Sequence, residues 1–147
     1  MSTVDLSRDG DIATLTLNNP GKLNAVDLGM WLQLAENMAV LSVDRDIRCI
    51  VLRGAGEEAF AAGGDLEEFV TARATLEQAL HYHDRVAAAL NAIANCPHPT
   101  VALIQGACIG GGLEIAGVCD LRICNASARF GAPINRLGFS MYPGEME

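Results

Sequence analysis

Apolar and polar residues alternate near the start of the chain, in the run IATLTL from Ile12 to Leu17. A repeat of two in a segment rich in Thr, Ile and Leu is typical of a β-strand with one buried face. The turn-forming residues NNPG, at positions 18–21, follow directly. The pattern therefore predicts a first strand that ends in a turn.

The next apolar positions are spaced by three or four residues, which predicts an amphipathic helix. This apolar stripe comprises Leu28, Trp31, Leu34, Met38 and Leu41. Asparagine is among the residues that cap helix N-termini, so we expect Asn24 to cap this helix. The helix should bury one face against a sheet.

Strand and helix patterns then continue to alternate. Further strands are predicted at Arg48–Arg53, Thr100–Gln105 and Asp120–Asn125. Helical sequence runs from Leu66 to about Ala94, in one or two pieces, with Asp65 as its expected cap, and a short helix follows the glycines at 110–112. This order predicts one α/β domain over residues 1–147 with no linker inside it.

The composition indicates a globular protein, with 50% hydrophobic and 19% charged residues. The net charge of −8 disfavours binding to nucleic acid or to an anionic membrane. An anionic ligand would therefore depend on local N–H groups and a few Lys or Arg side chains. The N-terminus does not resemble a secretory signal, and no apolar stretch approaches membrane-spanning length, which favours the cytoplasm. The five scattered cysteines are interpreted as reduced core residues.

Two glycine-rich loops, at 62–64 and 110–112, each follow a predicted strand and lead into a helix. Free N–H groups at a helix N-terminus attract negative charge, so such loops suit an oxyanion. Close packing of helix against sheet explains the glycines equally well. Neither loop matches a nucleotide-binding P-loop or the dinucleotide G-x-G-x-x-G pattern.

A carboxylate, Glu114, stands two residues after the second loop in an otherwise apolar segment. It can stabilise the helix dipole from a solvated first turn. It can equally act as a general acid or base beside oxyanion donors. These two roles stay open from the residues alone.

Three segments together resemble the enoyl-CoA hydratase/isomerase (crotonase) superfamily in order and spacing: LNNPGKLNAVD at 17–27, AFAAGGDL at 59–66, and the long stretch PTVALIQGACIGGGLEIAGVCDLRICNASARFGAP at 99–133. The resemblance implies a crotonase-like α/β fold, a ββα superhelix. It also implies an acyl-CoA thioester as substrate, with coenzyme A as part of that substrate and no separate cofactor or metal.

The resemblance also implies roles for individual residues. The N–H groups of Gly64 and Gly111 would hold the thioester oxygen, and Glu114 would be one of the paired glutamates that move water and protons in hydratases. Contacts with coenzyme A would fall on Ala62, Gly63, Gly64, Asp65 and Gly111, with Lys22 as a further contact.

The second glutamate of the family pattern is missing, because Ile134 occupies its position in FGAPI. An aliphatic side chain can neither activate water nor supply a proton. Glu114 could do both through one water, or Asn135 could orient a water. We expect a lyase that hydrates 2-enoyl-CoA. The alternatives are isomerisation, decarboxylation, C–C hydrolysis or a non-catalytic acyl-CoA-binding module.

Similar enzymes continue beyond this length with helices that complete the acyl pocket and build a homotrimer or hexamer. We therefore expect the chain to lack the C-terminal helical part of the family. A metal site is not expected, because His81 and His83 lie two apart and point to different sides of a helix.

Overall fold

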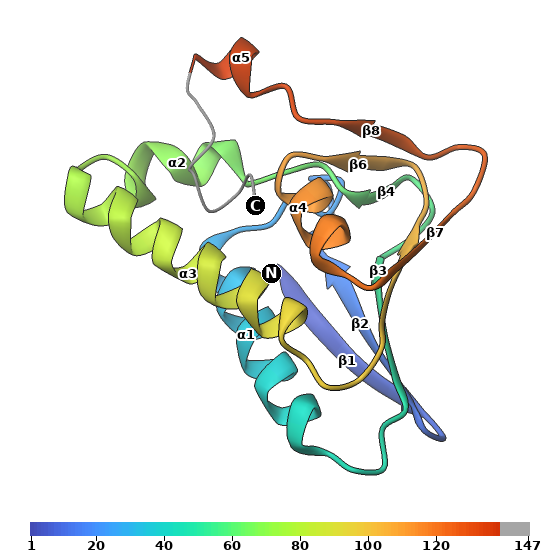
Figure 1. Ribbon diagram of the computed structural model, residues 1–147. Helices are drawn as coiled ribbons and strands as arrows, with labels where there is room; N and C mark the ends of the chain where they lie inside the picture. The colour runs from blue at the N-terminus through green and yellow to red at the C-terminus, as the bar shows by residue number, and fades with distance from the viewer. Residues whose placement is uncertain (139–147) are drawn as a thin grey trace.

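The structure is a computed structural model that describes residues 1–138. Within that range the chain forms two sheets and five helices (Figure 1). The larger sheet has the order β1-β2-β3-β5-β7, with strands β1 (Thr3–Asp9), β2 (Ile12–Asn18), β3 (Cys49–Gly54), β5 (Thr100–Ile104) and β7 (Leu121–Cys124). Only the β1–β2 pair in it is antiparallel. The predicted α/β class is confirmed.

The first predicted strand and helix are confirmed, and they build much of the core. In β2 the residues Ala13, Leu15 and Leu17 are fully buried, as the alternation predicts. The helix α1 (Leu28–Val43) buries its predicted stripe from Trp31 to Leu41, whereas Leu28 is half-buried. In Figure 1, α1 and α3 (Leu76–Ala94) run beside each other on one side of the larger sheet.

A second, smaller sheet consists of three parallel strands, β4 (Ala59–Ala61), β6 (Ala107–Ile109) and β8 (Arg129–Gly131). Helix α4 (Gly111–Val118) follows β6 directly and contacts both β4 and β6. None of these three strands was predicted from the sequence. Three-residue strands are too short to show a repeat of two, so the sequence pattern does not reveal them.

The cap predicted for α1 was also wrong. Asp27, not Asn24, is the N-cap, and its carboxylate accepts a hydrogen bond from Met30 N at 2.8 Å. The predicted cap Asp65 is confirmed, because its side chain accepts from Glu67 N at 3.2 Å. The long helical segment is divided into α2 (Leu66–Ala72) and α3.

The cysteines only partly match the prediction of a buried core position. Cys108 and Cys119 are buried, and burial raises their thiol pKa values to about 11 and about 12. Cys49 and Cys96 are half-buried, and Cys124 on β7 is exposed. The strand predicted there is real, but the side chains of β7 are all exposed.

His98 lies between Pro97 and Pro99, just before β5. Its side chain is only half-buried, yet its Nε2 atom is buried and has no hydrogen-bond partner within residues 1–138. In the same part of the chain, no helix has both the length and the apolar character that crossing a bilayer requires.

Candidate functional site

The two glycine-rich turns meet because the strands before them are neighbours. Strand β4 pairs with β6 in parallel, so the segments that follow the two strands leave the small sheet at the same edge. The turn after β4 carries Gly64 and leads into α2, and the turn after β6 leads into α4, whose first residue is Gly111. A Cβ atom placed on Gly111 would lie 3.7 Å from Gly64 N.

The N–H groups of Gly64 and Gly111 have no acceptor among residues 1–138. On either side of Gly64 the backbone is engaged, because Val26 N donates to Gly63 O at 2.8 Å and Asp65 N donates to Val26 O at 3.0 Å. In α4 the first helical bond runs from Glu114 N to Gly110 O, at 3.0 Å. The N–H of Gly111 precedes this bond and is one of the free donors of a helix start.

Glycine is required in these turns for two reasons. Gly63 and Gly110 have left-handed φ angles of 108° and 48°, which other residues rarely adopt. At Gly64, a Cβ would lie 2.8 Å from Phe69 Cζ, so the Phe69 ring would have to move to admit a side chain. The turns therefore expose backbone rather than side chains.

Glu114 lies in the first turn of α4 and is half-buried. It is three residues after Gly111, and residues three apart share one side of a helix. Glu114 and Gly111 therefore lie on the same side of α4. The predicted role of Glu114 as acid or base stays a prediction.

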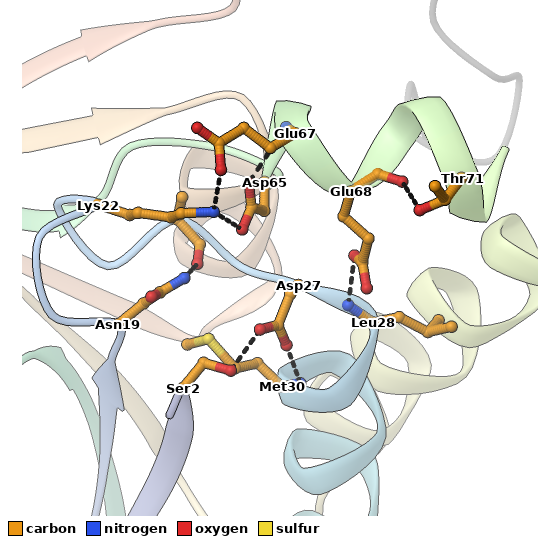
Figure 2. Close-up of polar contacts among 11 residues, drawn as sticks. Ser2, Asn19, Lys22, Asp27, Leu28, Met30, Asp65, Glu67, Glu68 and Thr71 are labelled. Carbon is orange, nitrogen blue, oxygen red and sulfur yellow. Dashed lines mark hydrogen bonds and ion pairs between the residues drawn. The ribbon is translucent and has the colours of Figure 1, made fainter.

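Lys22 is held by two carboxylates of the turn and of α2 (Figure 2). Its Nζ lies 2.7 Å from Asp65 Oδ2 and 2.8 Å from Glu67 Oε2. The hydrogen bond to Asp65, followed by that to Glu67, raises the pKa of Lys22 above its ordinary value. A phosphate that binds Lys22 must compete with both carboxylates.

The remaining predicted contacts with coenzyme A are backbone positions of the first turn. Ala62 N already donates to Leu23 O at 3.0 Å, so this N–H is occupied. Gly63 O accepts from Val26 N. Gly63 and Asp65, on either side of Gly64, both form backbone hydrogen bonds with Val26. Gly64 itself forms no backbone hydrogen bond within the described chain.

The sequence reasoning missed two acidic side chains at the start of α1: Glu68, which joins α2 to α1, and Asp27, the N-cap (Figure 2). Glu68 Oε2 accepts from Leu28 N at 2.8 Å, and burial raises the pKa of this carboxyl group. Asp27 caps α1 and also accepts from the Ser2 hydroxyl. A capping residue before an apolar stripe indicates the start of a helix, and both Asp27 and Asn24 fit this pattern.

Trp31 and Tyr82 line the site from the side of the helices. A Cβ on Gly111 would lie 3.1 Å from Trp31 Cζ2, and a Cβ on Gly64 would lie 3.7 Å from the Tyr82 oxygen. Phe69 meets Tyr82 edge to face, with ring centroids 5.5 Å apart, and the Arg73 guanidinium lies 4.5 Å from the Phe69 centroid. Burial raises the pKa of Tyr82 to about 12, so its hydroxyl is protonated at neutral pH.

Ile134 is the first residue of the short helix α5 (Ile134–Leu137) and is half-buried, whereas Asn135 is exposed. The segment before it reaches the second turn, because Gly110 N donates to Gly131 O at 2.9 Å. Within residues 1–138, no three His, Cys, Asp or Glu side chains gather as metal ligands would.

Comparison with known proteins identifies the family. The profile of the enoyl-CoA hydratase/isomerase family matches residues 7–145. The chain belongs to this family. A solved enoyl-CoA hydratase/carnithine racemase from Magnetospirillum magneticum superposes with a TM-score of 0.96 and 47% identity, over 99% of this chain and 55% of that one. The predicted crotonase-like fold is confirmed.

Relatives in the enoyl-CoA hydratase/isomerase family carry different activities in their names. The chain is 32% identical to a short-chain-enoyl-CoA hydratase of Clostridium acetobutylicum, over 98% of this chain and 54% of that protein. It is 36% identical to a mitochondrial 3-hydroxyisobutyryl-CoA hydrolase of Rattus norvegicus, over 94% of this chain and 36% of that protein. The chain thus spans about half the length, or less, of these relatives.

Proposed function

We propose that the chain is the acyl-CoA-binding, enolate-stabilising part of a lyase that adds water to a 2-enoyl-CoA. The observation that supports this function most is the close approach of Gly64 and Gly111, two residues whose N–H groups have no acceptor among residues 1–138. Two such donors suit the oxygen of a thioester whose carbonyl gains negative charge. Loss of one donor from an oxyanion hole typically costs about 3 kcal/mol in transition-state stabilisation.

The proposed reaction uses Glu114 as both base and acid. Its carboxylate takes a proton from water as the water oxygen bonds to C3 of the enoyl group, and the electron pair of the double bond moves onto the thioester oxygen. The Gly64 and Gly111 N–H groups stabilise the resulting enolate. Glu114 then returns the proton to C2 as the carbonyl re-forms, so one carboxylate serves both steps.

Coenzyme A is proposed to lie along the first turn, near Ala62, Gly63, Gly64 and Asp65, with Lys22 as a cationic contact. The Lys22 ammonium is already paired with two carboxylates, so this contact requires an exchange of partners. We further propose a cytoplasmic homotrimer or hexamer for the whole enzyme.

A second candidate rests on Ile134, which stands where a second carboxylate is expected. Without that group, the same enolate stabilisation could serve isomerisation, decarboxylation or C–C hydrolysis, or the chain could bind acyl-CoA without catalysis. The fold does not distinguish these reactions, because one scaffold hosts many chemistries.

The test is the hydration of crotonyl-CoA, followed as loss of enoyl-thioester absorbance, in wild type and Glu114→Gln. We expect the substitution to lower kcat by about 10²- to 10⁴-fold, the usual contribution of a positioned acid or base. Affinity for butyryl-CoA should be unchanged. Glu36→Gln is the matched control, because Glu36 is exposed on α1 and should leave both quantities as they are.

Unchanged turnover in Glu114→Gln would remove this carboxylate from the mechanism. Binding of acyl-CoA with no hydration by the wild type would instead favour the second candidate. Absence of acyl-CoA binding would contradict both.

A further inference from the structure

Two buried polar atoms beside the glycine turns have no hydrogen-bond partner within residues 1–138: Trp31 Nε1 and the Tyr82 hydroxyl oxygen. Their side chains are 2% and 3% exposed. They come from α1 and α3, two helices that pack against each other. Buried polar groups in native proteins almost always have partners, so these two indicate an acceptor that the described chain does not supply.

Both atoms border the residues of the proposed oxyanion hole. The indole of Trp31 lies against Gly111, and the hydroxyl of Tyr82 lies near Gly64. A ligand whose carbonyl oxygen reaches the two glycine N–H groups would therefore bring its acyl group close to both side chains. The Phe69 ring, which packs edge to face on Tyr82, borders this part of the site.

The chemistry of the pair is that of two hydrogen-bond donors. An indole nitrogen can only donate. Burial raises the pKa of Tyr82 to about 12, so its hydroxyl stays protonated at neutral pH. The nearby Trp31 N–H lowers this pKa, but by less than burial raises it. The indole N–H is therefore near the phenol oxygen, but the two do not meet the geometry of a hydrogen bond. Both can donate to a third atom.

We propose that Trp31 and Tyr82 form a donor pair that binds an oxygen atom of the acyl group other than the thioester carbonyl. The site would thus select oxo- or hydroxyacyl-CoA over acyl-CoA with a plain alkyl chain. This inference rests on the proposed function, because it takes an acyl-CoA as the ligand. An alkyl chain leaves both donors unsatisfied, and sites that hydrogen-bond a substrate discriminate strongly against analogues without the polar group.

The test compares the affinities of acetoacetyl-CoA and butyryl-CoA, which differ by one oxygen at C3, by titration calorimetry. We expect the wild type to bind acetoacetyl-CoA about tenfold more tightly, since one buried hydrogen bond is worth about that factor. Tyr82→Phe should lower this ratio to about twofold. Phenylalanine keeps the ring and its packing, and circular dichroism verifies the fold. His81→Gln, on the neighbouring exposed position of α3, is the control and should keep the ratio.

Equal binding of both thioesters by the wild type would contradict this inference but leave the proposed function standing. Equal binding is the result expected if buried water forms the hydrogen bonds of the two atoms. A preference that survives in Tyr82→Phe would likewise contradict it. If neither thioester binds, the proposed function fails, and the donor pair fails with it.

Discussion

At the scale of single residues, the Asn24 side chain joins the segment after β2 to the segment after β3. Its Nδ2 donates to Ala55 O at 2.9 Å and to Ala59 O at 2.8 Å, and its Oδ1 accepts from Asn19 N at 3.3 Å. Its backbone has a left-handed φ of 56°, which asparagine tolerates better than most residues. This amide therefore supports the strand β4 that leads to the first glycine turn.

Asn24→Ala should lower the free energy of unfolding by about 2–4 kcal/mol, because the buried Ala59 carbonyl and the half-buried Ala55 carbonyl lose their donor and alanine disfavours the left-handed conformation. Urea denaturation measures this change. The control Asn91→Ala removes an exposed amide from α3 and should change stability by less than about 0.7 kcal/mol. Equal effects of the two substitutions would contradict the structural role of Asn24.

At the scale of elements, α4 approaches β4 closely because Gly112 has no side chain. A Cβ there would lie 2.5 Å from Ala61 O and 2.9 Å from Ala61 Cβ, so the helix or the strand would have to move. A Cβ on Gly117, in the same helix, would meet nothing within 4 Å. Packing therefore requires glycine at position 112 but not at position 117.

We therefore predict opposite effects for the same substitution at these two positions. Gly112→Ala should lower the free energy of unfolding by about 1–3 kcal/mol, the usual cost of overpacking. Gly117→Ala should raise it by up to about 1 kcal/mol, because alanine favours the helix. Thermal and urea denaturation provide the measurement, and destabilisation at Gly117 as large as at Gly112 would contradict the packing argument.

At the scale of the whole molecule, the charge opposes the proposed ligand. The chain carries a net charge of −8, and the thioester of coenzyme A is also anionic. Lys22, the cation beside the first turn, is paired with Asp65 and Glu67 and adds no net positive charge there. Binding therefore depends on backbone donors and apolar contact, against long-range repulsion.

Salt should consequently strengthen acyl-CoA binding. Raising the ionic strength from about 0.05 M to about 0.5 M shortens the screening length well below 10 Å, so we expect affinity for butyryl-CoA to rise several-fold. Glu67→Gln frees one bond of Lys22 and should increase affinity at low salt more than Glu36→Gln, which makes the same charge change on α1. Weaker binding at high salt would indicate that cationic contacts dominate.

The sequence by itself determined most of the longer elements, but not β1, a seven-residue strand that was missed because only one of its side chains, that of Val4, is buried. Burial along a single element follows its own repeat, so the strand around Leu15, the stripe of α1 and the split helix could be read from local spacing. The glycine turns and the Asp65 cap depend on equally local rules. The family resemblance added the prediction that Gly64 and Gly111 act together.

Only the tertiary structure decided which atoms meet across segments. The strands of the smaller sheet have three residues each and exist because they pair with one another, which no local repeat records. Asn24 and Asp27 are both good capping residues, but the Asn24 side chain is engaged by Ala55 O and Ala59 O, and Asp27 caps the helix. From the sequence, Tyr82 is one more apolar position of α3. Only the tertiary structure places its hydroxyl oxygen near Gly64. Periodicity records burial within an element, whereas the pairing of polar atoms depends on residues far apart in the chain.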